Sequence, residues 1–180
     1  MTHYDAIVLG AGAAGMMAAI EAGKRGRQVL LVDHASTPGE KIRISGGGRC
    51  NFTNTNATIA AGRERFLSQN PRFALSALSR YTPADFIKLV DKHKIAHHEK
   101  TLGQLFCDGS ALEIINMLQT ELRRARVTVA LSTEIRAVRK TESGFELALS
   151  ARATRSRCRC RPSTSAPARC CSASMARTSA

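Results

Sequence analysis

Six residues near the start of the chain form a glycine-rich pattern whose spacing suits a bound pyrophosphate. The pattern reads Gly10-Ala-Gly12-Ala-Ala-Gly15. Gly10 allows a tight turn, Gly12 lets the main chain approach a phosphate, and Gly15 lets a helix pack closely on a sheet. The N–H groups at the start of that helix, at Ala13 and Ala14, would attract negative charge. The spacing predicts a dinucleotide cradle but does not separate FAD from NAD.

Asp33 supplies the acidic residue that such a cradle uses for the sugar. It ends the next predicted strand, 18 residues after Gly15. A carboxylate there can accept hydrogen bonds from both ribose hydroxyls and disfavours a 2′-phosphate. The alternative is a glycine-rich turn in an unrelated α/β protein. The coincidence of strand, turn, helix and acid favours the dinucleotide.

A second unusual string, KIRISGGGRCNFTN, occupies residues 41–54. Its three successive glycines are Gly46, Gly47 and Gly48. Consecutive exposed N–H groups of this kind form a concave anion site. Lys41 and Arg49 flank the glycines with positive charge, and Asn51 follows with a neutral amide that could bind a flavin ring or a substrate. The alternative is a flexible surface loop without a ligand.

Residues 1–149 resemble the YhiN-like flavoproteins, the BaiN/RdsA-type family of NAD(P)/FAD-dependent oxidoreductases. The resemblance rests on residues 5–15, 38–54 and 67–106. It implies that the first glycine turn and Asp33 hold FAD and that NAD(P)H is the electron donor. It also implies that Lys41 lies near the adenosine ribose and that the loop from Gly46 to Asn51 lies near the flavin.

The resemblance further implies ene reduction, in which hydride passes from NAD(P)H through the flavin to an activated carbon–carbon double bond. Family members make dihydrouridine in large-subunit (23S) ribosomal RNA or reduce bile-acid intermediates. Residues 67–106 look more like the ribosomal RNA branch. We therefore expect ribosomal RNA as substrate, with a small-molecule enone as the alternative. Two further hypotheses stay open: an inactive, truncated nucleotide-binding fragment, and a basic RNA-binding module without redox activity.

Cys50 is the candidate proton donor for ene reduction, which needs a positioned acid beside the hydride acceptor. Arg49 precedes it directly and should lower the pKa of the thiol. The alternative is a cysteine that only packs, and packing is also what we expect of Cys107. No metal site is expected: His93, His97 and His98 stand among lysines that repel a cation.

The elements that must position these motifs alternate between strand and helix. A strand at 5–9, a helix at 16–24 and a strand at 28–32 form a βαβ unit. Residues 34–62 show no periodicity. Later expected elements are a helix from Thr82 to about Lys92, a helix capped by Ser110 and Glu113, a strand at 127–131 and a hairpin at 134–149. The predicted fold class is α/β, an FAD-binding Rossmann-type doubly wound parallel sheet with a β-meander, truncated at its C-terminal side.

The charge of the chain is distributed unevenly. The 180 residues carry +13, of which residues 151–180 supply seven arginines and no acid. We expect two parts: residues 1–149 as the N-terminal part of an FAD/NAD(P)-binding domain, and residues 150–180 as a basic low-complexity tail that is disordered or read out of frame. A genuine basic arm that binds nucleic acid is the alternative. With the rest of the domain missing, FAD binding should be weak.

Composition also bears on location and partners. The longest uncharged stretch, residues 6–20, is too short for a membrane span and lacks the basic start of a signal peptide. The cysteines show no paired framework, which favours a reducing compartment. We therefore expect a cytoplasmic protein with no membrane association and no obligate protein partner.

Overall fold

The computed structural model describes residues 2–60, 66, 68–151 and 155–160. The chain divides into two compact units. Unit 1 comprises residues 1–40 and 118–180, and unit 2 comprises residues 41–117. The two glycine motifs therefore belong to different units, which are described separately below.

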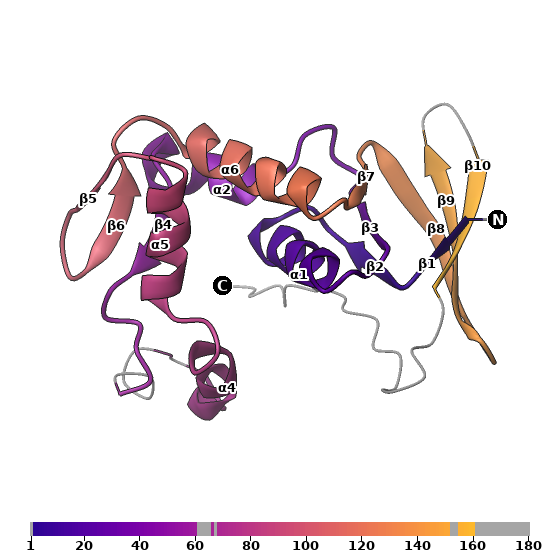
Figure 1. Cartoon of the computed structure of the whole chain (residues 1–180), viewed down its shortest axis with the longest axis horizontal. Coiled ribbons are helices and arrows are strands. Elements are labelled where there is room, and N and C mark those ends of the chain that lie inside the picture. The colour runs from indigo at the N-terminus through magenta and orange to yellow at the C-terminus, as the bar shows by residue number, and fades with distance from the viewer. Residues whose placement is uncertain (1, 61–65, 67, 152–154, 161–180) are drawn as a thin grey trace. The chain divides into compact units, whose positions relative to one another are not determined.

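A three-stranded parallel sheet forms the centre of unit 1. Its order is β2 (Ala6–Leu9), β3 (Val29–Val32) and β7 (Thr128–Ala130). Helix α1 (Ala13–Lys24) joins β2 to β3 and lies beside both strands (Figure 1). All four residues of β3 are buried, as a strand covered on both faces requires. The predicted βαβ unit and the α/β Rossmann-type class are confirmed.

A second sheet of unit 1 has the order β1-β10-β9-β8. The strands are β1 (Thr2–Tyr4), β8 (Thr133–Thr141), β9 (Gly144–Ala151) and β10 (Arg155–Cys160). The last three form an antiparallel meander, and the predicted hairpin is its first part, with Thr141 opposite Gly144. An apolar cluster of buried residues joins the two sheets: Ile7, Leu30, Val32, Leu147 and Leu149.

The expected tail begins inside this second sheet. The boundary at 149/150 falls within β9, and residues 155–160 form β10, where we expected no regular structure. Main-chain pairing with β9 and β1 accounts for the difference, because a strand added to an existing edge needs no apolar pattern of its own. Residues 161–180 lie outside the described part, and the assignment of the tail as out of frame stays a prediction.

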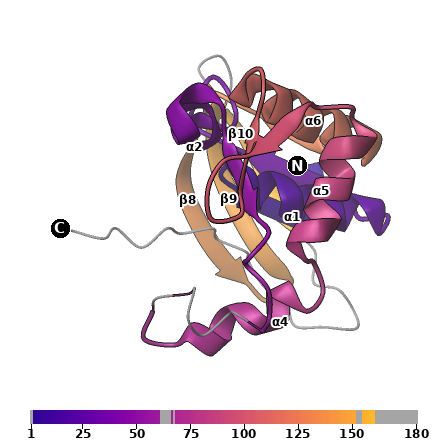
Figure 2. The ribbon, with the colours of Figure 1, turned by 90° about the vertical axis from the view of Figure 1, so that its left-hand side faces the viewer.

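Unit 2 contains a small antiparallel sheet with the order β4-β6-β5. Its strands are β4 (Asn51–Asn54), β5 (His97–Glu99) and β6 (Gln104–Cys107), which the sequence did not indicate. Helix α2 (Glu40–Ile44) begins one residue before the first residue of unit 2. The remaining helical elements of the unit are a 3₁₀ turn (Ser45–Gly48), a second 3₁₀ turn (Pro71–Ala74), α4 (Leu75–Leu78) and α5 (Pro83–Lys92). Figure 2 shows α2, α4 and α5 in a view turned by 90° from that of Figure 1.

The two predicted helix starts are both present. The Thr82 hydroxyl accepts a hydrogen bond from Asp85 N, and the Asp85 carboxylate accepts one from Thr82 N, so α5 begins with a complete capping box. At α6 (Ala111–Arg124) the Glu113 carboxylate accepts from Ser110 N at 3.1 Å. Apolar residues at helical spacing form a buried face of α6: Ala111, Ile114, Ile115, Leu118 and Leu122. None of the described helices is long and apolar enough to cross a membrane.

Candidate functional site

The first glycine turn brings main chain against main chain. Gly10 has φ +102°, a conformation that a side chain would strain. A Cβ built on Gly15 would lie 1.8 Å from the Gly10 carbonyl oxygen. No side chain can be accommodated at that distance, so α1 approaches the end of β2 as closely as a backbone allows. The role predicted for Gly15 in close helix packing has this geometric basis.

Gly12 faces open space at the N-terminus of α1. A Cβ on Gly12 would meet no atom within 4 Å, and its φ of −80° is one that any residue can adopt. Ala13 and Ala14 are exposed, and the first turn of α1 contains no acidic residue. The first N–H groups of a helix have no intrahelical acceptor and carry partial positive charge. This open, electropositive cradle fits the diphosphate of a dinucleotide such as FAD.

The carboxylate of Asp33 holds the glycine turn in place. Its Oδ2 accepts a hydrogen bond from Ala11 N at 2.5 Å, and its Oδ1 accepts one from Ala35 N at 2.8 Å. Ala11 is completely buried, and its carbonyl oxygen accepts a hydrogen bond from Gly39 N at 2.9 Å. Each carboxylate oxygen keeps a second lone pair for a ribose hydroxyl. Asp33 therefore supports the turn, and its carboxylate keeps capacity to accept further hydrogen bonds.

Ala11 and Gly39 are functional positions that the sequence reasoning missed. Ala11 stands at a variable position of the glycine motif, so the motif gives no reason to select it. Gly39 has φ +75° and follows the buried Pro38. The Pro-Gly pair indicates a turn, but nothing in the sequence shows that this turn returns to Ala11.

The second glycine loop, in unit 2, has three successive left-handed residues. Gly46, Gly47 and Gly48 have φ values of +57°, +64° and +85°. A Cβ on Gly47 or Gly48 would meet nothing within 4 Å, whereas one on Gly46 would lie 2.6 Å from Cε1 of Phe106. The loop therefore rests on the Phe106 ring at one end and is open at the other. Phe106 is a third position that the sequence reasoning missed.

The charged and polar residues around this loop have different surroundings. Lys41, on α2, and Arg49, at the end of the loop, are both exposed. The Asn51 amide, oriented to satisfy its neighbours, donates to the carbonyl oxygens of Thr53 at 3.0 Å and Leu105 at 3.3 Å. Asn51 thus joins β4 to β6. Lys41, Arg49 and Asn51 lie within unit 2, and the residues of the first glycine turn lie within unit 1.

Cys50 is buried, and its thiol is less acidic than the sequence suggested. Burial raises the pKa of Cys50, and a hydrogen bond with Ser45 lowers it by a smaller amount. The expectation that Arg49 lowers this pKa is wrong, because the Cys50 side chain is 4% exposed and its desolvation dominates. Burial also raises the pKa of Cys107 to about 12. Cys107 is fully buried, as expected of a packing residue.

Two histidines of unit 2, His97 and His98, each lie beside one carboxylate. His97 Nε2 lies 2.9 Å from Asp91 Oδ1, and His98 Nδ1 lies 2.6 Å from Asp108 Oδ1. Within the described residues, no three His, Cys, Asp or Glu side chains gather closely enough to hold a metal ion.

The geometry of unit 1 defines the class of fold. A parallel strand, a glycine turn, a closely packed helix and a second strand ending in an acid make a Rossmann-type nucleotide-binding fold. Residues 4–161 match the family model described as the HI0933-like protein Rossmann domain, and the chain belongs to this family.

Relatives and solved structures agree with that assignment. The chain is 55% identical over 149 residues to the ribosomal RNA dihydrouridine synthase of Escherichia coli (strain K12), covering 83% of this chain and 36% of the relative. It is 27% identical over 142 residues to the 3-dehydro-bile acid delta(4,6)-reductase of Clostridium scindens, covering 77% of this chain and 33% of the relative. A flavocytochrome c3 fumarate reductase shares the fold, with a TM-score of 0.59 and 18% identity over 89% of this chain and 33% of that one. The chain spans about a third of the length of these curated relatives.

Proposed function

We propose that this chain provides the dinucleotide-binding part of an FAD-dependent oxidoreductase. The open space at Gly12, beside the N-terminus of α1, is the observation that carries the proposal. The diphosphate of FAD would lie there against the N–H groups of Ala13 and Ala14. Gly10 and Gly15 would keep the turn tight, and Asp33 would bind the ribose hydroxyls.

The segment from Lys41 to Asn51 would contact the same cofactor at two places. Lys41 would lie near the adenosine ribose, and the loop Gly46–Asn51 would lie near the flavin, with Arg49 supplying positive charge. One finding supports a ligand role for this loop: a Cβ on Gly47 or Gly48 would meet no atom within 4 Å, so the main chain there is open to a ligand.

The reaction we propose is reduction of an activated carbon–carbon double bond, with NAD(P)H as the electron donor. When bound, FAD would supply hydride transfer between the two substrates. The chain's own contribution is to bind and orient the cofactor and to hold a proton at Cys50 Sγ. The raised pKa keeps that thiol protonated at neutral pH, as a proton donor must be.

The substrate we favour is a uracil ring in 23S ribosomal RNA. The support is the 55% identity to a protein named ribosomal RNA dihydrouridine synthase. Reduction of a small enone is the second candidate, supported by the weaker similarity to a bile-acid reductase. With ribosomal RNA as substrate, the protein would act in the cytoplasm.

A chimera tests the proposal. Residues 1–149 of this chain replace the matching segment of the Escherichia coli relative, in a strain that lacks that relative. We expect the chimera to purify with flavin absorbance and to restore dihydrouridine in 23S ribosomal RNA. The same chimera carrying Gly12→Val should lose both. A chimera that folds but has no flavin would contradict the cofactor assignment, and one with flavin but without dihydrouridine would contradict the substrate.

A further inference from the structure

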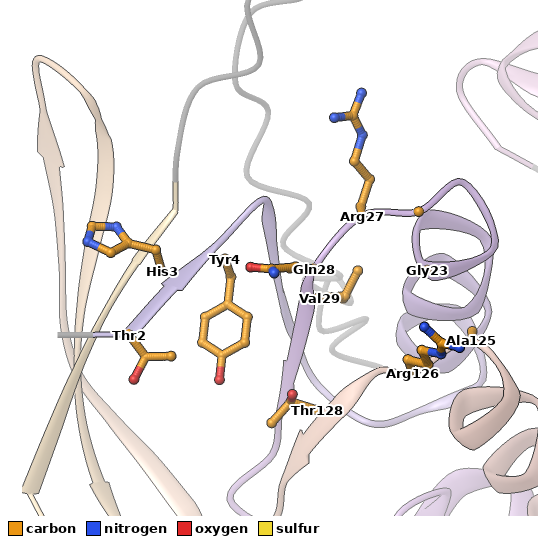
Figure 3. A pocket seen from close by; sticks show the side chains of 11 residues that line it. Thr2, His3, Tyr4, Gly23, Arg27, Gln28, Val29, Ala125, Arg126 and Thr128 are labelled. Atoms are coloured by element: carbon orange, nitrogen blue, oxygen red, sulfur yellow. The ribbon is translucent and has the colours of Figure 1, made fainter.

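Unit 1 contains a cavity of about 520 Å³ at the end of α1 that lies farthest from the glycine turn. Its walls come from the C-terminal ends of α1 and α6, from the whole of β1 and from the starts of β3 and β7. Figure 3 shows His3 on one side of the cavity and Arg126 on the other, with Tyr4 and Gln28 between them. A volume of this size accommodates a ligand as large as a nucleotide.

The two helices that border the cavity end in the same way and touch each other. After α1, Arg27 N donates to Ala22 O at 3.2 Å, and after α6, Val127 N donates to Leu122 O at 3.0 Å. A Cβ on Gly23 would lie 2.5 Å from the carbonyl oxygen of Ala125, so the helix ends are in close backbone contact. This contact brings Arg27 and Arg126 to the same opening.

The cavity has a strongly basic lining. Arg27, Arg126 and His3 are exposed, and within the described residues their side chains form no hydrogen bond or ion pair. The lining contains no acidic residue, and it adds neutral donors from Thr2, Tyr4, Gln28 and Thr128. Neighbouring cations on the same helices are engaged: Arg25 pairs with Glu21 at 2.9 Å, and Arg123 donates to Thr120 at 2.9 Å.

The backbone at Arg126 provides a second, independent observation. Arg126 has φ +56° at the position after α6 where α1 places Gly26, with φ +75°. Glycine is the favoured residue there because a Cβ is strained in the left-handed region. Cations near a helix C-terminus can be purely structural. A structural cation at the end of α6 does not have to be at the strained position of Arg126, because Arg123 and Arg124 already lie in the last turn of this helix.

We propose that this cavity binds phosphate, and that it holds phosphodiester groups of the RNA substrate. Arg27 and Arg126 both line the cavity, and in Figure 3 their side chains point in different directions, so each would contact a different phosphodiester group of the RNA. The assignment to RNA rests on the proposed function. The site is distinct from the glycine turn, so it would add affinity for a large substrate without contacting the cofactor cradle.

The test measures binding of a labelled single-stranded RNA oligonucleotide to the full chain by fluorescence anisotropy over a range of salt concentrations. We expect Arg126→Gly and Arg27→Gln each to weaken binding by about tenfold and to reduce the slope of log affinity against log salt by about 1. Arg25→Gln and Arg123→Gln remove the same charge and should weaken binding by about twofold at most. Arg126→Gly should also unfold at the wild-type temperature or above it, because glycine relieves the strain.

The binding measurements distinguish the phosphate site itself from its assignment to RNA. Affinity losses equal to those of the two control variants would overturn the site, leaving the arginines as helix-end charges. Absence of binding to both RNA and inorganic phosphate would also overturn it. Binding of inorganic phosphate that is lost in Arg126→Gly, without preference for RNA, would support the anion site and assign a small phosphate-bearing ligand. FAD titration of the same variants should be unchanged, so failure here is distinct from failure of the proposed cofactor role.

Discussion

The Asp33 carboxylate accepts a hydrogen bond from the Ala11 main-chain N–H at 2.5 Å. This contact joins the end of β3 to the middle of the glycine turn that follows β2. The acid that such motifs use for a sugar is therefore also a structural part of the turn that would hold the diphosphate. Loss of the carboxylate should affect both ends of the nucleotide site.

Asp33→Asn should destabilise unit 1 and weaken FAD binding. An amide has one acceptor oxygen, so either Ala11 N or Ala35 N would face an NH₂ donor. Leaving one such N–H unsatisfied costs about 1–3 kcal/mol, measurable as a lower midpoint of urea unfolding. Glu40→Gln is the matched control: Glu40 Oε1 accepts from the Thr37 hydroxyl at 3.0 Å, and an amide oxygen can replace it. Equal effects of the two variants would contradict the structural role of Asp33.

Gly15→Ala should destabilise the chain although it places alanine in a helix. In an open helical position this substitution stabilises by about 0.5–1 kcal/mol. Here the new methyl group would lie 1.8 Å from the Gly10 carbonyl oxygen, so α1 must move away from the turn. Thermal unfolding shows whether Gly15→Ala raises or lowers the stability of the chain. Ala18→Gly, at an exposed position of α1, calibrates the helix propensity, and a higher melting temperature for Gly15→Ala would be incompatible with the close approach.

The stability of the chain should fall with rising pH because of Cys107. Its pKa is about 12 in the folded state against 9.0 ordinarily, so between these values the unfolded thiol has lost a proton that the folded one retains. The stabilising contribution is full below about pH 9 and falls by up to about 1.4 kcal/mol per pH unit above it. Urea unfolding can be followed from about pH 8 to about pH 11. The free energy of unfolding should decline more steeply with pH for the wild type than for Cys107→Ala. Parallel declines would contradict the shifted pKa.

Gly46→Ala and Gly47→Ala should differ sharply although both residues are left-handed. Each substitution strains the backbone by about 1 kcal/mol, since φ is +57° at Gly46 and +64° at Gly47. Only at Gly46 would the methyl group also meet the Phe106 ring, 2.6 Å away. We expect Gly46→Ala to cost about 1–3 kcal/mol more than Gly47→Ala. Phe106→Leu should reduce that difference in a double-mutant cycle, and purely additive effects would argue against the contact.

The elements with strong local signals could be predicted from the sequence. The apolar run before Gly10 and the Thr82-Pro83 start of α5 gave the correct elements because their signals lie within a few residues. The strands β4 and β6 were missed because each has four residues and their pairing joins Asn51 to Phe106, far apart in the sequence. The functional consequence is that Phe106, which supports the second glycine loop, could not be found from the motif.

The acidity of Cys50 could not be predicted from the sequence either. The neighbouring Arg49 suggested a lowered pKa, but a neighbour in sequence does not determine burial. The left-handed φ of +55° at Cys50 and its contact with Ser45 place the thiol inside unit 2, where desolvation controls its acidity. The residue type therefore indicated Cys50 as the candidate proton donor, but the direction of its pKa shift could be inferred only from the fold.

A ³¹P NMR titration of FAD with the full chain tests the cofactor cradle most directly, because it also detects weak binding. We expect the two diphosphate resonances to shift with the wild type and with Ala18→Val, an exposed change on α1. They should not shift with Gly12→Val, because the valine side chain would fill the open cradle. Absence of a shift with the wild type, or an equal shift with Gly12→Val, would contradict the account.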